Sequence, residues 1–154
     1  PALHFDRFRE AALEHFGGDP ERHDAALFNR ITAATLATHL ALCKPGQTVI
    51  GVSASYSHPS VVRASQRAGT TLSDTAGGEQ FGEALARSDD VGLVVMTRLA
   101  VTYEVLPLEQ IAAVVQMAHA RDIPVYLDDA DDDVDDDDDE DDDDDDDLSL
   151  IHIY

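Results

Sequence analysis

Three short segments of the sequence carry side chains suited to acid–base, ionic or aromatic chemistry. They are Ser53–His58, Thr97–Glu104 and Asp128–Ala130, and they offer an imidazole, a guanidinium beside a phenol, and carboxylates. A guanidinium such as that of Arg98 can bind a carboxylate through two parallel hydrogen bonds. Arg98 is therefore a candidate for binding a substrate carboxylate, with an ordinary surface position as the alternative. Each segment follows an apolar run, so the elements that hold these runs decide whether the segments meet.

Apolar periodicity predicts helices and strands that alternate along the chain. Helices are expected over residues 3–16, Thr32–Leu42, Pro59–Ala68, Glu79–Arg87 and Leu108–Ala120, and strands over Thr48–Val52, Thr70–Ser73, Val91–Met96 and Pro124–Leu127. Pro59 at the start of one helix and Gly69 after its end are typical helix boundaries. The strand at Val91–Met96 is almost wholly apolar, as expected when helices cover both faces of a parallel sheet.

This alternation predicts an α/β fold with a mostly parallel sheet between two helical layers. We expect a helical segment over residues 1–24, a partial three-layer αβα domain over 25–130, and an acidic low-complexity tail over 131–154. In such sheets ligands bind beyond the carboxyl ends of the strands. The three segments that carry chemistry all lie at such ends.

The net charge of −22 comes mostly from the tail. Of the 32 acidic residues, 18 lie between Asp128 and Asp147, and the other 14 face all 10 basic residues, so residues 1–127 carry about −4. This balance argues against a nucleic-acid surface, which needs a basic patch. Cys43 is the only cysteine, which excludes a disulfide framework and a cysteine-based zinc site. We expect a cytoplasmic protein, with no membrane span and no signal peptide.

The tail from Asp131 is almost pure aspartate, so we expect it to be disordered. Its last residues, Leu148 to Ile153, resemble the conceptual translation of a sequencing-library transposon end. We therefore expect the tail to be non-native and the natural coding sequence to stop near Ala130. Re-amplifying the gene from its source and finding the aspartate run intact would contradict this expectation.

Several stretches, in their order and spacing, resemble the large domain of fold-type-I pyridoxal-phosphate enzymes. They are Phe28-Asn29-Arg30-Ile31-Thr32-Ala33-Ala34-Thr35, Lys44-Pro45-Gly46-Gln47-Thr48-Val49-Ile50, Ser57-His58-Pro59-Ser60, Leu106-Pro107-Leu108 and Ile123-Pro124-Val125-Tyr126-Leu127-Asp128-Asp129-Ala130. The resemblance is to the aspartate-aminotransferase-like superfamily, nearest to selenocysteine synthases, cysteine desulfurases and threonine aldolases. It implies pyridoxal 5′-phosphate as cofactor, transferase or lyase chemistry on an amino-acid or aminoacyl substrate, and a parent protein that is a homodimer or larger.

The resemblance also implies roles for individual residues. Thr32, Ala33 and Ala34 would form a phosphate cup, because amides at a helix start bind anions; an ordinary helix cap with a small packed face is the alternative. His58 would stack on the pyridine ring, or it caps the helix that begins at Pro59. Asp128 would face the ring nitrogen and keep it protonated, with Asp129 as competitor and the mere start of the acidic tail as alternative.

The loop Thr97–Tyr103 lies where members of this family contact the cofactor ring or the substrate. Arg98 and Tyr103 are therefore weak candidates for substrate binding, and Glu104 is equally open. The segment departs from cysteine desulfurases, which have an Asn–Glu pair there, and this difference weakens that assignment.

The resemblance implies a lysine that holds the cofactor as a Schiff base. The one lysine, Lys44, precedes the strand at Thr48 and so lies at the wrong end of the sheet. In the family the lysine lies downstream of the strand-end aspartate. We therefore expect no catalytic lysine in this chain, and an inactive fragment as written.

We weighed three other function classes against this resemblance. A nucleotide-binding doubly wound domain would need a glycine-rich fingerprint or a Walker A sequence, and both are missing. The aspartate run could bind cations or basic proteins without any enzyme activity, and a basic-amino-acid decarboxylase of the same fold is a near neighbour. No metal site is expected, because the histidines at positions 4, 15, 23, 39 and 119 lack ligand spacing and are expected on the surface or on helix faces.

Overall fold

The fold is a parallel sheet between two pairs of helices, seen in a computed structural model that describes residues 2–128 and 151–153. The helices are α1 (Ala2–His15), α2 (Ile31–Leu42), α3 (Pro59–Ala68), α4 (Gly77–Arg87) and α5 (Leu108–His119). The strands are β1 (Thr48–Ser53), β2 (Thr71–Ala76), β3 (Val91–Thr97), β4 (Val125–Asp128) and β5 (Ile151–Ile153). The strand order is β2-β1-β3-β4-β5, and only the β4–β5 pairing is antiparallel. The predicted α/β fold with a parallel sheet is confirmed.

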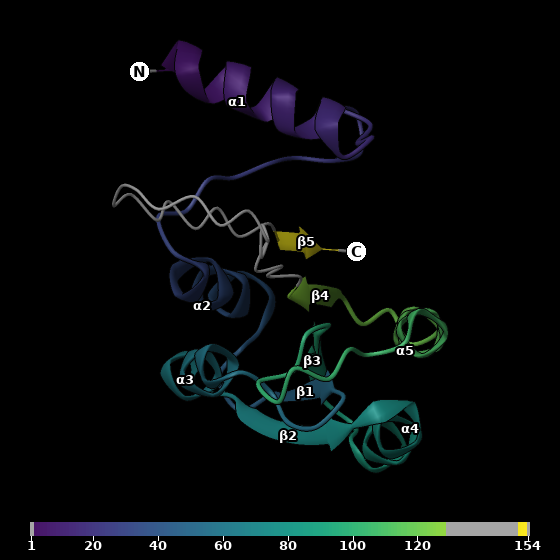
Figure 1. The fold of residues 1–154 in the computed structure, drawn as a ribbon. Coiled ribbons are helices and arrows are strands. Elements are labelled where there is room, and N and C mark those ends of the chain that lie inside the picture. The colour runs from purple at the N-terminus through teal and green to yellow at the C-terminus, as the bar shows by residue number, and fades with distance from the viewer. Residues whose placement is uncertain (1, 129–150, 154) are drawn as a thin grey trace, which may run out of the picture.

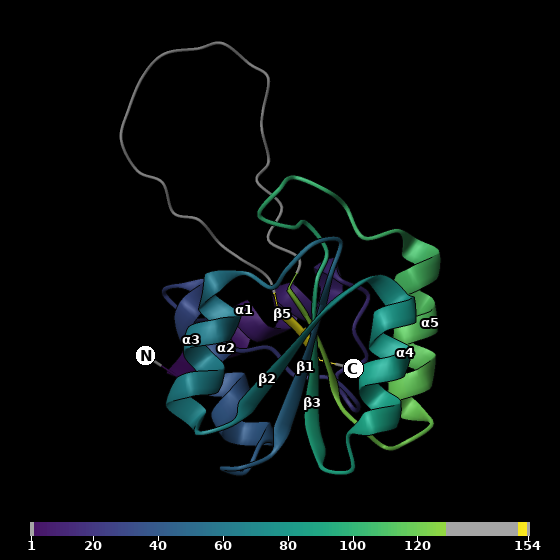
Figure 2. The same ribbon diagram turned by 90° about the horizontal axis from the view of Figure 1, so that it is seen from below.

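Side-chain alternation sends the two faces of the sheet into two separate cores. Helices α2 and α3 cover one face, and α4 and α5 cover the other (Figures 1 and 2). The α2/α3 face buries Val49, Val61, Leu93, Val95 and Tyr126. The α4/α5 face buries a larger set that includes Ile50, Val52, Phe81, Val94, Met96, Val114 and Val125. The apolar strand at Val91–Met96 is therefore covered on both sides, as predicted.

The predicted elements match the structure closely, with two differences around β2. This strand continues to Ala76, three residues beyond the predicted end, because Asp74 and Thr75 pair in register with Gly51 and Val52 of β1. Helix α4 begins at Gly77 rather than Glu79. Gly77 has a φ of 73°, and the side-chain carbonyl of Gln110 accepts the Gly78 amide at 3.1 Å, so the helix start is capped from α5.

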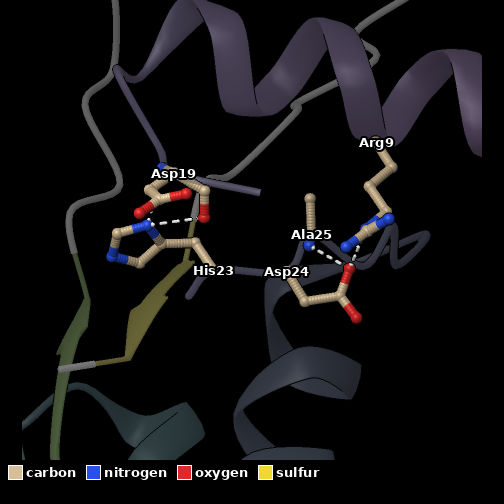
Figure 3. Close-up of polar contacts among 5 residues, drawn as sticks. All are labelled: Arg9, Asp19, His23, Asp24 and Ala25. Carbon is tan, nitrogen blue, oxygen red and sulfur yellow. Dashed lines mark hydrogen bonds and ion pairs between the residues drawn. The ribbon is translucent and has the colours of Figure 1, made fainter. Parts of the chain in front are cut away.

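Helix α1 lies apart from the two helical layers (Figure 1). Leu13 is buried, but Phe5 is 62% exposed and Phe16, directly after the helix, is 46% exposed, so the apolar side of this segment is only partly covered. Arg9 of α1 forms an ion pair with Asp24 in the segment that follows (Figure 3). The Ala25 amide and then Arg9 lower the pKa of Asp24. An exposed pair of this kind contributes little to folding.

The described part of the tail, Ile151–Ile153, forms a strand where we predicted disorder. We predicted disorder from residue 131 to the end, but Ile151–Ile153 pair with β4 as β5. Alternating β-branched residues suit a strand, and β4 offers its unpaired edge. The rest of the predicted disorder falls on residues 131–150 and 154, which lie outside the described residues. Among the described helices, none has the length and apolar content needed to cross a bilayer.

His39 is a buried polar link between α2 and α3. Its Nδ1 donates to the Thr35 carbonyl at 2.8 Å, and its Nε2 lies 3.2 Å from the Ser65 hydroxyl, which can donate to it. In the neutral ring with its proton on Nδ1, Nε2 accepts from the Ser65 hydroxyl. Burial lowers the pKa of His39, and the bond to Thr35 opposes that shift only in part. We expected this histidine on the surface or a helix face; it is on a helix face, but fully buried.

Acidification is therefore expected to weaken folding through His39. Because folding lowers the His39 pKa, its contribution is full above the unfolded value of about 6.5 and is lost as the pH falls through the folded value. The slope is at most about 1.4 kcal/mol per pH unit. His39→Gln should reduce stability near neutral pH but flatten the decline below it, in denaturant titrations at several pH values. His119→Gln, at an exposed position of α5, should keep the wild-type slope; a wild-type slope in His39→Gln would contradict the assignment.

Candidate functional site

The carboxyl ends of β1, β3 and β4 meet at one edge of the sheet with buried polar side chains. Ser53, Thr97 and Asp128 end these strands and are 0%, 4% and 4% exposed. Thr97 pairs in register with Asp128. Because Val95 and Tyr126 pack on the α2/α3 face, alternation turns Thr97 and Asp128 toward the same side. The loops that follow β1 and β3 leave this edge together (Figure 2).

Tyr126 connects this polar edge to the start of α2. Its hydroxyl lies 3.1 Å from the Thr35 hydroxyl, and the Thr35 hydroxyl donates to the Ile31 carbonyl at 2.9 Å. Tyr126 is therefore the donor of the pair. Burial, followed by the negative charge of Asp128, raises the pKa of Tyr126 well above its ordinary value. The phenol stays protonated, and the Asp128 carboxylate lies close enough to influence it.

The start of α2 lies over this edge, because the helix runs antiparallel to the strands. Arg30 is the N-cap residue and makes no side-chain capping bond. The amides of Ala33 and Ala34 both donate to the Arg30 carbonyl, at 3.0 and 3.2 Å. Thr32 is half-buried, Ala33 is exposed and Ala34 is buried. Of the three predicted phosphate-cup residues, Thr32 thus has the amide that helix geometry leaves available.

His58 caps α3 at the same edge. Its Nδ1 accepts the Ser60 amide at 3.2 Å and lies 2.8 Å from the Ser60 hydroxyl. An Nδ1 that accepts leaves the proton of the neutral ring on Nε2. Burial and then the charge of Arg63 lower the pKa of His58. The capping alternative is therefore realised, and it fixes the ring as a neutral imidazole without excluding the stacking role.

The loop after β3 carries the two weaker candidates. The Arg98 amide donates to the Asp128 carbonyl at 3.1 Å, and the Leu106 amide donates back to the Arg98 carbonyl at 2.8 Å. Tyr103 is 81% exposed and has a φ of 62°, which is unusual for a residue with a side chain. The Thr102 hydroxyl joins this loop to Ser55 at 3.0 Å and donates to Glu104 at 2.8 Å. The structure thus places Arg98 beside the strand-end aspartate and Tyr103 in solvent.

Contacts of Ser57 with Asp74 and Gly51, two residues that the sequence analysis did not connect with the site, support the His58 loop. The Ser57 amide and hydroxyl both donate to the Asp74 carboxylate, and Gly51 leaves room for this contact. A longer reading of β2 would have placed Asp74 opposite Gly51. No metal-binding group of three or more His, Cys, Asp or Glu side chains is found in the described part of the chain.

Lys44 lies at the opposite edge of the sheet. It is in the turn between α2 and β1, where its amide donates to the Gln47 side chain at 2.8 Å. Gln47 in turn reaches Asp90, which precedes β3. The amino ends of the strands therefore surround Lys44, whereas Asp128 and His58 lie at the carboxyl ends.

Comparison with known proteins gives curated relatives that share one name. No family model matches the chain. A "UPF0425 pyridoxal phosphate-dependent protein" of Methanothermobacter thermautotrophicus is 36% identical over 131 residues, which cover 84% of this chain and 32% of the relative. One of the same name from Methanococcus maripaludis is 26% identical over 84% of this chain and 36% of the relative. The chain thus spans about a third of the length of these relatives.

Solved structures with a similar fold include an aminotransferase and a lyase with bound pyridoxal phosphate. An Escherichia coli protein with a methionine aminotransferase function has a TM-score of 0.64 at 20% identity, covering 82% of this chain and 35% of its own. The SepCysS–SepCysE N-terminal domain complex gives 0.62 at 17%, covering 79% and 34%. A pyridoxal-phosphate-bound C–S lyase from Staphylococcus hominis gives 0.55 at 12%, covering 65% and 28%. The resemblance to fold-type-I pyridoxal-phosphate enzymes is confirmed for the fold.

The Tyr126–Thr35 contact should contribute measurably to stability. Tyr126→Phe removes the buried donor but keeps the ring, so we expect a loss of about 1 kcal/mol in the free energy of unfolding. A double-mutant cycle with Thr35→Val should show a coupling of about 0.5 kcal/mol or more. Tyr103→Phe is the matched control at an exposed phenol and should change stability by less than about 0.5 kcal/mol. Equal effects of the two phenylalanine variants would refute the contact.

Proposed function

From a chain with the large-domain fold of fold-type-I pyridoxal-phosphate enzymes, we infer that the whole protein is a pyridoxal-phosphate-dependent transferase or lyase. We propose an amino-acid or aminoacyl substrate, with a selenocysteine-synthase-like reaction as the narrowest version. The observation that carries the proposal is the buried Asp128 carboxylate beside Thr97 and Tyr126, under the start of α2. The name of the curated relatives supports the same cofactor.

The described residues fit this cofactor. The Thr97 hydroxyl is buried and has no hydrogen-bond partner among the described residues, so it is a polar group at this edge that a ligand can satisfy. Thr32, Ala33 and Ala34 put small side chains at the start of α2, where the helix dipole favours a phosphate. When bound, pyridoxal phosphate supplies an electron sink for the substrate's amino-acid carbon.

The candidate site residues have separate roles in the proposed function. The Asp128 carboxylate holds a proton on the ring nitrogen, because a nearby negative charge favours the protonated form. The neutral His58 ring would stack on the face of the cofactor ring. Arg98 and Tyr103, on the loop that starts beside Asp128, bind and orient the substrate carboxylate.

The chain as written lacks the lysine that would bind the cofactor covalently. Lys44 sits at the amino ends of the strands and cannot take that place. We therefore propose that the 154-residue chain is inactive in the family reaction and that a lysine beyond Asp128 completes the site. We also propose that the whole protein is a cytoplasmic homodimer or larger assembly.

The whole gene product should carry lysine-bound pyridoxal phosphate. Purified with the cofactor, it is expected to show visible absorbance that borohydride removes. Reduction attaches the cofactor permanently to its lysine, and we expect that lysine to be one other than Lys44. Lys44→Ala should keep the absorbance, because that lysine lies at the far edge of the sheet. The proposal would be overturned if the whole protein showed no such absorbance, or if the Lys44→Ala variant lost it.

Asp128 should matter more for turnover than for binding. In the whole protein, Asp128→Asn keeps the shape of the side chain but removes the charge, so turnover should fall by at least about 100-fold. The assay is cofactor-dependent conversion of amino acids from a panel. Asp122→Asn is the matched control, at an exposed turn with a φ of 55° that Asn accepts. Turnover of Asp128→Asn within about threefold of the control would argue against the assignment.

A further inference from the structure

We propose that Asp74 is a positioning residue of the candidate site, which holds through Ser57 the loop that presents His58. The inference rests on the proposed function for its consequence but not for its geometry. Asp74 lies on the edge strand β2, in register with Gly51 of β1. It is thus one strand away from the loop it would fix.

Ser57 donates two hydrogen bonds to the Asp74 carboxylate, and we call this pair of bonds the Asp74 bracket. The Ser57 hydroxyl donates to one carboxylate oxygen at 2.6 Å, and the Ser57 amide donates to the other at 3.0 Å. Hydrogen bonds to a charged carboxylate are short and strong. Ser57 is only 2% exposed, and the next residue is His58. The bracket therefore fixes the backbone on which the imidazole is mounted.

The sheet leaves space for this bracket at Gly51. A Cβ there would lie 2.9 Å from the Asp74 carboxylate and in overlap with the Ser57 hydroxyl oxygen. The backbone of Gly51 has an ordinary strand conformation. A glycine is therefore needed here because of the close packing, and not because of the φ angle. Glycine within a strand often marks such a close approach. A glycine at position 51 of the sequence is therefore what this contact requires.

The far side of His58 is also held. Its Nδ1 accepts the Ser60 amide, which orients the ring on α3. The Ser60 bond sets the rotation of the ring, and the Asp74 bracket sets the position of the residue. With both constraints, the imidazole needs no reordering when a ligand ring arrives, and preorganisation of this kind increases affinity.

The test uses the whole gene product with histidine labelled by ¹⁵N. NMR of the apoprotein reports the His58 ring, whose signals are assigned by their loss in His58→Gln. Asp74→Ala should shift these signals, and Asp74→Asn, which keeps one acceptor for the hydroxyl, should shift them less. Pyridoxal phosphate titration should then show about tenfold weaker binding for Asp74→Ala, with altered visible circular dichroism of the bound cofactor.

Asp90→Ala is the matched control. Asp90 is also exposed and also bridges two segments, through Gln47 at 2.7 Å, but at the opposite edge of the sheet. It should lower the melting temperature about as much as Asp74→Ala while leaving the His58 signals and the cofactor affinity unchanged. Gly51→Ala should disturb the His58 signals in the wild-type background and much less in a Ser57→Ala background, because the overlapping oxygen is then gone.

The two proposals fail in different ways. Unchanged His58 signals in Asp74→Ala would overturn the positioning role, whatever the protein binds. A wild-type protein that binds no pyridoxal phosphate would overturn the proposed function, while the His58 signals would still decide the role of Asp74. Shifted signals with wild-type affinity and dichroism would overturn the claim that the bracket serves the cofactor.

Discussion

The parallel pairing of β3 with β4 puts Thr97 beside Asp128, and the candidate site depends on that register. Along β3 and β4 the residues on the α2/α3 face are apolar in the middle and polar at the carboxyl end. Tyr126 then Asp128, and Val95 then Thr97, are the two clearest cases. A slip of one residue would turn the aspartate toward the α4/α5 core. Burial of the apolar residues thus fixes where the polar ones emerge.

Helix α2 depends on the same register. Its contact with β4 runs through the Tyr126 and Thr35 hydroxyls, and its contact with α3 runs through His39 and Ser65. Both are hydrogen bonds buried in the α2/α3 layer, so they specify one arrangement where apolar packing alone would tolerate several. They place the first turn of α2 over the strand ends, with the Thr32 amide left available to an anion.

The sequence was sufficient to predict most elements, and it indicated the carboxyl-end edge of the sheet as the place of the candidate site. Strong periodicity marked the buried strands and most helix ends, and the strand-end rule then indicated where to look. Apolar periodicity did not predict the second half of β2. Residues Ser73-Asp74-Thr75 have no apolar alternation, because β2 is an edge strand and is partly exposed to solvent. Asp74 was passed over for that reason. His39 and Tyr126 were missed as partners because their contacts join distant parts of the chain, 26 and 91 residues apart.

The position of Lys44 separates it from the candidate site by the length of a strand. Strand β1 has six residues between the Lys44 turn and the His58 loop, a rise of about 20 Å. No rotamer of a lysine at the start of the strand can cover that distance to its end. The same parallel topology that gathers Asp128, Thr97 and His58 at one edge therefore keeps Lys44 away from them. A side chain that reaches this candidate site must therefore approach from the carboxyl ends of the strands.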